Sequence, residues 1–174
     1  MINRGMSRKS DRGTPRIPPR RVIYIVCEGE KTEHIYFNAI KHQRRLTNIK
    51  IYIDRGTKCG CDPKSLLEYA KNIKNEDKYV DAWCVFDDDG RHYVSQVIEN
   101  AVKRPKVNVA LSNPCFELWY YLHHDYSTGA CTQSQMVERL NAFMPGYTKN
   151  GDVFSLLPDR AAAMERAEEL RRHH

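Results

Sequence analysis

Four short apolar runs alternate with segments of helical spacing, and this alternation is the strongest constraint on the fold. The runs occupy residues 22–27, 49–53, 82–86 and 107–111. The run at 22–27 is continuous, which is typical of a strand that is covered on both faces, as in parallel sheets. The pattern therefore predicts an α/β fold with an open, mostly parallel sheet flanked by helices, a Rossmannoid arrangement.

A helix is predicted after each expected strand. Thr32 is the expected N-cap of the first helix, and Asp62 followed by Pro63 supplies the cap and first-turn residues of the second. Asn113 and Pro114 repeat this pattern before a later helix. The remaining helices are predicted at 94–102, 133–144 and 159–170, so that the last two form a helical C-terminal extension.

Residues 1–20 are expected to be a flexible basic tail, and residues 21–174 a single domain. The tail carries much of the net charge of +6 and has almost no apolar side chains, so it cannot fold alone. Its arginines suit phosphate binding, and a solvated leader without a ligand is an equal alternative. His173 and His174, at the end of a helical run, predict a tag remnant or an artificial truncation of the domain.

The chain is expected to be cytoplasmic and to have no membrane segment. No stretch approaches the roughly 18 apolar residues of a membrane span, and the N-terminus is basic and contains prolines instead of an apolar signal core. The six cysteines, several of them in apolar runs, predict reduced thiols instead of a disulfide framework. The sequence does not decide between a monomer and a homo-oligomer.

Carboxylates follow two of the predicted strands. Glu28 comes directly after the first strand, and Asp87 and Asp89 come after the third. Open parallel sheets bind ligands beyond the carboxyl ends of their strands, and residues two apart in extended backbone point to the same side. The three carboxylates therefore predict a site for Mg²⁺ or Mn²⁺. Helix capping and solvated loop charge are the alternative roles, and the pairing of Glu28 with the aspartates favours the metal.

Other residues near this edge are candidates for contacts to nucleic acid. Lys31 and Arg91 lie beside the acidic residues and carry cationic groups that suit phosphate. Ser112 and Asn113 precede a helix whose first amides could bind phosphate, with helix capping as the alternative role. Tyr121 is the aromatic side chain expected to be free to stack on a base.

Two further patterns are weak predictors of metal sites. Cys59 and Cys61 lack a second pair at zinc spacing, and His123 and His124 point in different directions on a predicted helix. The sequence also contains no G-x-x-x-x-G-K-[ST] motif, the phosphate-binding loop of many ATPases. Any ATP hydrolysis linked to this chain is therefore expected to come from a partner.

Three blocks of the sequence, VCEGEKTE…YF, WCVFDDDG and LSNPCFELWYYLHH, resemble the signature blocks of the RloB-like family. This bacterial family is similar to TOPRIM domains and is associated with restriction and phage-defence loci. The resemblance covers most of the chain, and three blocks in the right order are more specific than any one alone. It implies a TOPRIM-like fold in which Glu28 is a general acid or base and Asp87 and Asp89 hold a divalent metal.

The resemblance also suggests further site residues. TOPRIM nucleases of the overcoming-lysogenization-defect type use a further carboxylate and a lysine, and Glu117 and Lys149 are the candidates for these positions. Interaction of Glu117 with a helix N-terminus is its alternative role. Family members commonly have an acidic residue or a histidine after the D-x-D pair, where this chain has Gly90 and Arg91. This departure leaves the number of metal ions open.

The leading functional hypothesis is a metal-dependent nuclease that cleaves DNA, RNA or tRNA in a bacterial defence system. The family resemblance implies control by an ATPase partner encoded nearby. The first alternative is a catalytically silent adaptor that binds a nucleotide or nucleic acid at the same sheet edge and docks on an ATPase. A phosphotransferase that acts on a small molecule through a nucleophilic aspartate is a more remote alternative.

Overall fold

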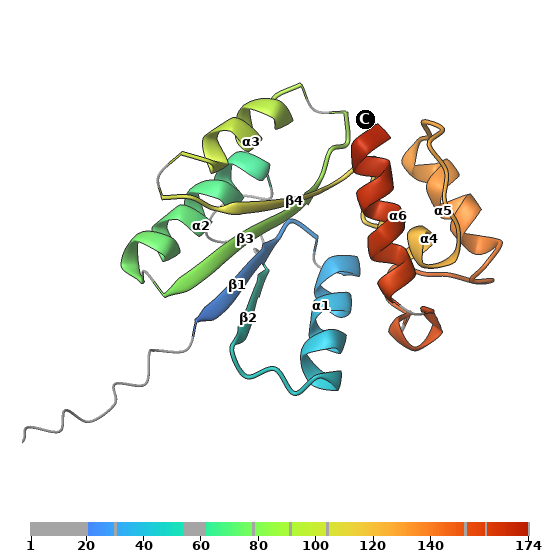
Figure 1. Ribbon diagram of the computed structural model, residues 1–174, viewed down its shortest axis with the longest axis horizontal. Helices are drawn as coiled ribbons and strands as arrows, with labels where there is room; N and C mark the ends of the chain where they lie inside the picture. Colours follow the sequence, from blue (N-terminus) through green and yellow to red (C-terminus); the bar gives the residue numbers. More distant parts are fainter. Residues whose placement is uncertain are drawn as a thin grey trace, which may run out of the picture.

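The computed structural model describes residues 21–29, 31–53, 62–77, 79–90, 92–103, 105–151, 153–158 and 160–173. Its strands are β1 (Val22–Cys27), β2 (Ile49–Ile53), β3 (Val80–Asp87) and β4 (Asn108–Ser112). All of these strands pair in parallel, in the order β2-β1-β3-β4. The predicted α/β fold with a parallel sheet is therefore confirmed (Figure 1). The expected basic tail lies outside the described residues.

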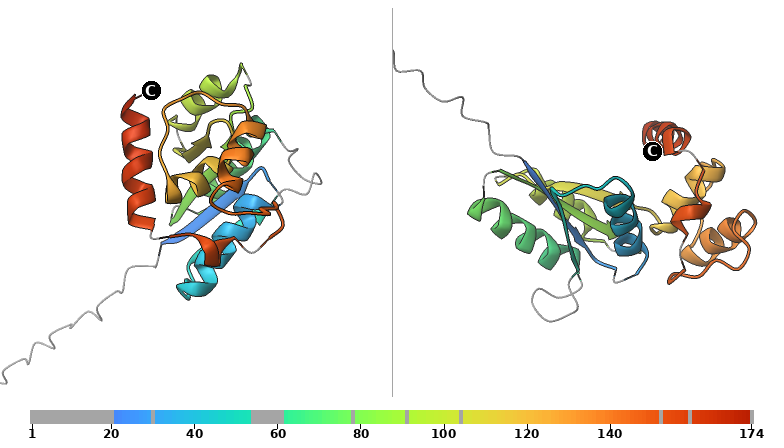
Figure 2. Two further views of the ribbon diagram at one scale, coloured as in Figure 1. Left: turned by 90° about the vertical axis from the view of Figure 1, so that its right-hand side faces the viewer. Right: turned by 90° about the horizontal axis from the view of Figure 1, so that it is seen from below.

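Helices lie on both faces of the sheet and at one of its ends. They are α1 (Thr32–Gln43), α2 (Pro63–Glu76), α3 (Val94–Ala101), α4 (Glu117–His124), α5 (Gln133–Asn141) and α6 (Arg160–His173), with a short 3-10 turn η1 (Phe154–Leu156). Figures 1 and 2 show α2 and α3 on one face, α1 on the other, and α4 to α6 beyond the carboxyl ends of the strands. No helix of the described residues is both long and apolar enough to cross a bilayer.

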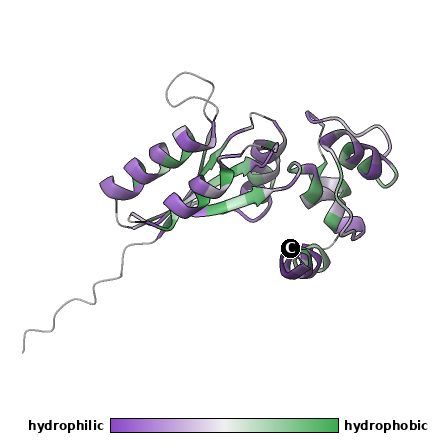
Figure 3. Ribbon diagram, turned by 90° about the horizontal axis from the view of Figure 1, so that it is seen from above, coloured by the Kyte–Doolittle hydropathy of each residue, from purple (hydrophilic) through white to green (hydrophobic). Residues whose placement is uncertain are grey.

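Two apolar cores follow from the alternation of side chains along the strands. Val26 and Phe86 face α2 and α3, whereas Ile25 and Val85 face α1 and the helices after β4. All four side chains are at most 7% exposed, as expected for strands covered on both faces. Figure 3 shows the apolar strands enclosed by helices whose outer surfaces are hydrophilic. The four cysteines within the described residues, Cys27, Cys84, Cys115 and Cys131, are free thiols, as predicted.

α2 and α5 begin at side-chain caps, whereas Thr32, the expected cap of α1, is the first residue of that helix and forms no cap hydrogen bond. The Asp62 side chain accepts hydrogen bonds from the amides of Lys64 and Ser65, so the predicted cap of α2 is confirmed. The prediction for α4 was wrong, because the Asn113–Pro114 peptide bond is cis and the helix begins only at Glu117. Asn113 is therefore not the cap of this helix, and Glu117 is its first residue.

A carboxylate cluster as the candidate functional site

Glu28 and Asp87 meet at the carboxyl edge of the sheet. β1 and β3 are parallel neighbours, and their pairing continues past the end of β1, where the Glu28 amide donates to the Val85 carbonyl at 3.0 Å. The backbone amide of Asp87 lies 3.4 Å from Oε2 of Glu28, which accepts its hydrogen bond. The expectation that these two carboxylates emerge side by side is therefore confirmed.

Asp89 lies in the same region, but a turn positions it instead of the extended backbone that was expected. β3 ends at Asp87, and Asp89 and Gly90 form a turn with positive φ values of 47° and 68°. The argument from alternation in extended backbone therefore does not apply to Asp89. Its exposed carboxylate still acts on Asp87, whose pKa it helps to raise.

Glu33 is a fourth carboxylate at this edge. It lies in the first turn of α1, and only 5% of the residue is exposed. Burial raises the pKa of Glu33, and the charges of Glu117 and Glu28 raise it further. Gly29 provides the space for this side chain, because a Cβ on Gly29 would overlap the Glu33 carboxylate. The pair therefore explains why glycine follows Glu28.

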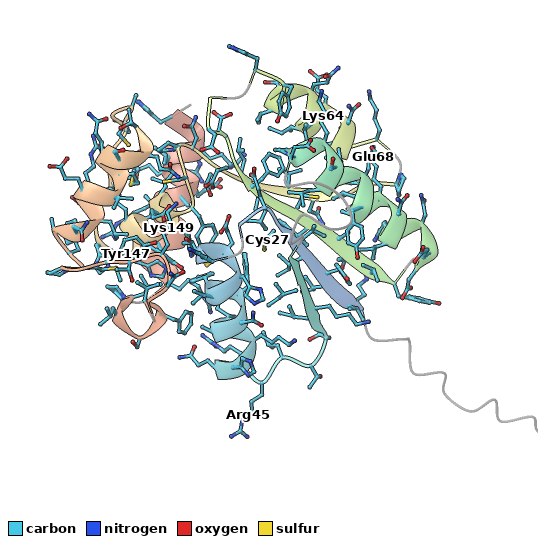
Figure 4. All side chains as sticks on the ribbon, turned by 180° about the vertical axis from the view of Figure 1, so that it is seen from behind. Cys27, Arg45, Lys64, Glu68, Tyr147 and Lys149 are labelled. Carbon is cyan, nitrogen blue, oxygen red and sulfur yellow. The ribbon has the colours of Figure 1, made fainter. Side chains whose placement is uncertain are left out.

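Glu117 is the fifth carboxylate and the most deeply buried, with 1% of the residue exposed. The Tyr147 hydroxyl donates a hydrogen bond of 2.9 Å to Oε1 of Glu117, and the Lys149 ammonium lies 3.7 Å from the same oxygen. Figure 4 shows Tyr147 and Lys149 near the start of α1, across from Cys27 at the end of β1. These two side chains explain how a carboxylate is tolerated here.

The five acidic residues Glu28, Glu33, Asp87, Asp89 and Glu117 are called the carboxylate cluster below. Burial, together with the negative charges of the other four members of the cluster, raises the pKa of Asp87 to about 8. Oδ1 of Asp87 is buried and has no hydrogen-bond partner among the described residues. Asp87 is therefore the member whose negative charge is least well compensated.

The raised pKa values predict a pH dependence of stability. Between the ordinary pKa of 3.8 and about 8, folded Asp87 keeps a proton that the unfolded chain has lost, so the free energy of unfolding falls as pH rises. His123 and His124 have lowered pKa values and act below about pH 6.5, in the opposite sense. Denaturant unfolding of the metal-free protein from about pH 6.5 to 8 should therefore show decreasing stability.

Asp87→Asn provides the comparison for this measurement. An asparagine cannot ionise, so the variant should lose less stability over the same pH interval than the wild type. Equal slopes for the two proteins would show that Asp87 does not carry a raised pKa.

The fit of the cluster to a metal ion depends on how many protein ligands the ion needs. Within the described residues, no group of three or more His, Cys, Asp or Glu side chains is arranged to hold a metal ion. Mg²⁺, however, usually keeps several waters and takes only one or two carboxylates together with substrate phosphates. The unpartnered Oδ1 of Asp87 is a hard oxygen ligand of this kind. The donor set therefore fits Mg²⁺ or Mn²⁺ as a partly hydrated ion.

The candidate nucleic-acid contacts lie at the same edge where the structure describes them. Ser112 pairs with Asp87 in the β3–β4 register, and its carbonyl accepts the amide of Asp88 at 2.9 Å. Lys31 and Asn113 are exposed. Arg91 lies outside the described residues. The exposed Lys31 side chain precedes α1, so a cation is available beside the cluster.

Tyr121 and His123, which were considered as ligand contacts, are buried and take part in other hydrogen bonds. Tyr121 was expected to be free for stacking, but it is 5% exposed and its hydroxyl donates to Asp125, so this prediction was wrong. His123 is 4% exposed, and its Nδ1 lies 2.9 Å from the Pro158 carbonyl. Cys59 and Cys61 lie outside the described residues.

A family model for RloB-like proteins matches residues 23–174, which include every member of the carboxylate cluster. The chain belongs to the RloB-like family. No curated protein and no solved structure matches it. The matched region of this RloB-like chain runs from β1 through α6, so the family unit includes both the sheet edge and the helices that complete the cluster.

Two residues of the site were not identified from the sequence. Glu33 was not among the candidate residues, although its place shortly after Glu28 and Gly29 brings it back to the strand end. That spacing was the available signal. Tyr147 lies in a loop far along the chain, and no local pattern indicates that its hydroxyl contacts Glu117.

Proposed function

We propose that this RloB-like chain is a metal-dependent nuclease that cleaves phosphodiester bonds of DNA or RNA in a bacterial defence system. The observation that carries the proposal is the partly buried Asp87 carboxylate, whose buried Oδ1 has no hydrogen-bond partner among the described residues and which has four further carboxylates around it. A cation would remove this repulsion, and such an imbalance is typical of functional sites. The cluster also lies beyond the carboxyl ends of parallel strands, where folds of this class bind ligands.

Asp87 and Asp89, with Glu28 beside them, are the residues that would hold Mg²⁺ or Mn²⁺. When bound, such an ion polarises a phosphodiester and lowers the pKa of water. The Asp87 amide donates to Oε2 of Glu28 and positions this carboxylate, which would accept a proton from an attacking water and return one to the leaving group. Lys149, whose side chain is 49% exposed, offsets the charge of Glu117 and can contact a substrate phosphate.

The direct test is incubation of the purified protein with single-stranded DNA, double-stranded DNA and tRNA. We expect cleavage of at least one substrate with Mg²⁺ or Mn²⁺ and none with EDTA. Because the sequence has no phosphate-binding loop motif, the assay should be repeated with any ATPase that is found encoded beside this chain. Absence of cleavage in every combination would contradict the proposal.

A silent adaptor that binds nucleic acid is the second candidate. The observation that favours it is the lack of a ready three-ligand metal group among the described side chains. Lys31 and the Lys149 ammonium would then contact phosphate without chemistry. Metal binding separates the two functions, because an adaptor does not need an ion at the carboxylate cluster.

Calorimetric titration with Mn²⁺ is expected to show binding that depends on Asp87. Asp87→Asn should weaken this binding by at least about tenfold, because even residues that only orient metal ligands contribute about 10–100-fold. Binding should also raise the unfolding midpoint of the wild type as Mn²⁺ is added. Equal affinity of wild type and variant would favour the adaptor.

A further inference from the structure

A cavity lies beside the C-terminal half of α1, outside the carboxylate cluster. It has a volume of about 470 Å³ and is bordered by α1, α4, η1 and the start of α6. Small-molecule sites commonly have volumes of about 300–1,000 Å³. Figure 1 shows the first turn of α6 and the segment before it beside α1. None of the five members of the carboxylate cluster is among its described lining residues, so the cavity is distinct from the cluster.

The charge of the cavity comes from two arginines. Arg44, at the C-cap of α1, and Arg160, the first residue of α6, both line it, and no acidic side chain is among its described lining residues. His123 also borders the cavity, but burial lowers its pKa, so the ring is neutral near pH 7. Two guanidinium groups on different helices suit a phosphate, which they can bind with paired hydrogen bonds.

Other residues that line the cavity are aromatic or apolar. Phe154 and Leu157 lie in it, and the Phe154 ring is held against the buried Tyr36 with ring centroids 5.7 Å apart. Phe154 is only partly buried, so its ring is available to a ligand. Aromatic side chains of this kind stack on nucleobases without requiring one base sequence. The lining of the cavity therefore includes both cationic and aromatic side chains.

We propose that this cavity binds a nucleoside 5′-phosphate, with Arg44 and Arg160 on the phosphate and Phe154 against the base. The same chemical group occurs in a free nucleotide and at the 5′ end of a nucleic-acid strand. The binding requires neither a metal ion nor the carboxylate cluster. Its success or failure is therefore independent of nuclease activity.

The test is calorimetric titration in EDTA with AMP and with the 5′-phosphorylated dinucleotide pApA, which represent the two sources. Adenosine and inorganic phosphate serve as partial probes. We expect AMP, pApA or both to bind, and each partial probe to bind at least about tenfold more weakly than the better of them. Binding of AMP alone indicates a free nucleotide, whereas binding of pApA alone indicates a strand end.

Variants locate the binding. Arg160→Gln and Arg44→Gln should each weaken it at least about tenfold, the loss expected for one charge-assisted contact. Arg44 is exposed and only its backbone takes part in the described hydrogen bonds, so Arg44→Gln should fold normally. Arg172→Gln, at the far end of α6, is the control of equal charge, and Asp87→Asn is the control for the cluster. Both controls should retain the wild-type affinity.

Three results would overturn the proposal. The first is that neither AMP nor pApA binds, and the second is that binding is unchanged in both Arg44→Gln and Arg160→Gln. The third is that inorganic phosphate binds as tightly as AMP, which would remove the role of Phe154. Trp119 gives an independent signal, because its ring contacts both His123 and Tyr36 at the cavity border, and its fluorescence should change on binding.

Discussion

Asp87→Asn is expected to reduce metal-dependent cleavage of nucleic acid by at least about 100-fold, because residues that merely orient metal ligands already contribute about 10–100-fold. The variant should remain folded. It replaces a group whose ionisation is opposed by burial and by four other carboxylates, and whose Oδ1 has no partner among the described residues, so the metal-free protein should be at least as stable as the wild type. Gel-based cleavage assays and denaturant unfolding measure the two effects.

Asp88→Asn is the matched control for this experiment. It makes the same chemical change one residue further along, and Asp88 is not among the charges that raise the pKa of Asp87. Cleavage by Asp88→Asn should stay within about threefold of the wild type, as for a residue that does not contact the reacting atoms. Full activity in Asp87→Asn, or equal losses in both variants, would reject the assignment of Asp87.

Gly29→Ala is expected to disturb the cluster through shape alone. The new methyl group would overlap the carboxylate of Glu33, which is buried and cannot simply turn into water. We expect a loss of stability of about 1–3 kcal/mol, as for other overpacked sites, and a loss of cleavage of at least about tenfold. Denaturant unfolding and the cleavage assay give both values for the same preparation.

A double-mutant cycle separates this clash from a general backbone effect. Glu33→Ala removes the atoms that the Gly29 methyl group would meet, so Gly29→Ala should cost much less stability in that background. Cleavage should stay low in the double variant, because the Glu33 carboxylate is absent. If Gly29→Ala is equally destabilising with and without Glu33, then the contact between these residues is not the cause.

The order of strands and helices was predictable because each element has its own signal in the sequence. The apolar run at 22–27 and the cap at Asp62 predict a buried strand and a helix start from a few residues each. The start of α4 was not predictable in this way. The dipeptide Asn113–Pro114 is compatible with a helix start, and it is equally compatible with the turn around a cis peptide bond that the chain adopts.

The site was partly predictable for the same reason. Glu28 and Asp87 follow strands that pair in parallel, so strand identity alone places them together. Asp89 reaches the cluster through a turn with positive φ, which strand periodicity cannot predict. The burial of Glu117 depends on Tyr147 and Lys149, and such contacts between distant segments come from tertiary packing, which has no local sequence signal.

The loop after α5 brings Tyr147 and Lys149 back to Glu117 (Figure 4). The charge of this loop therefore acts on the carboxylates at the strand edge. Lys149 also lowers the pKa of Glu33, which opposes the effect of burial on that group. Lifting this loop by a partner protein would remove the Lys149 cation, so the pKa of Glu33 would rise further. Control of ionisation could thus be exerted from outside, with the strands themselves unmoved.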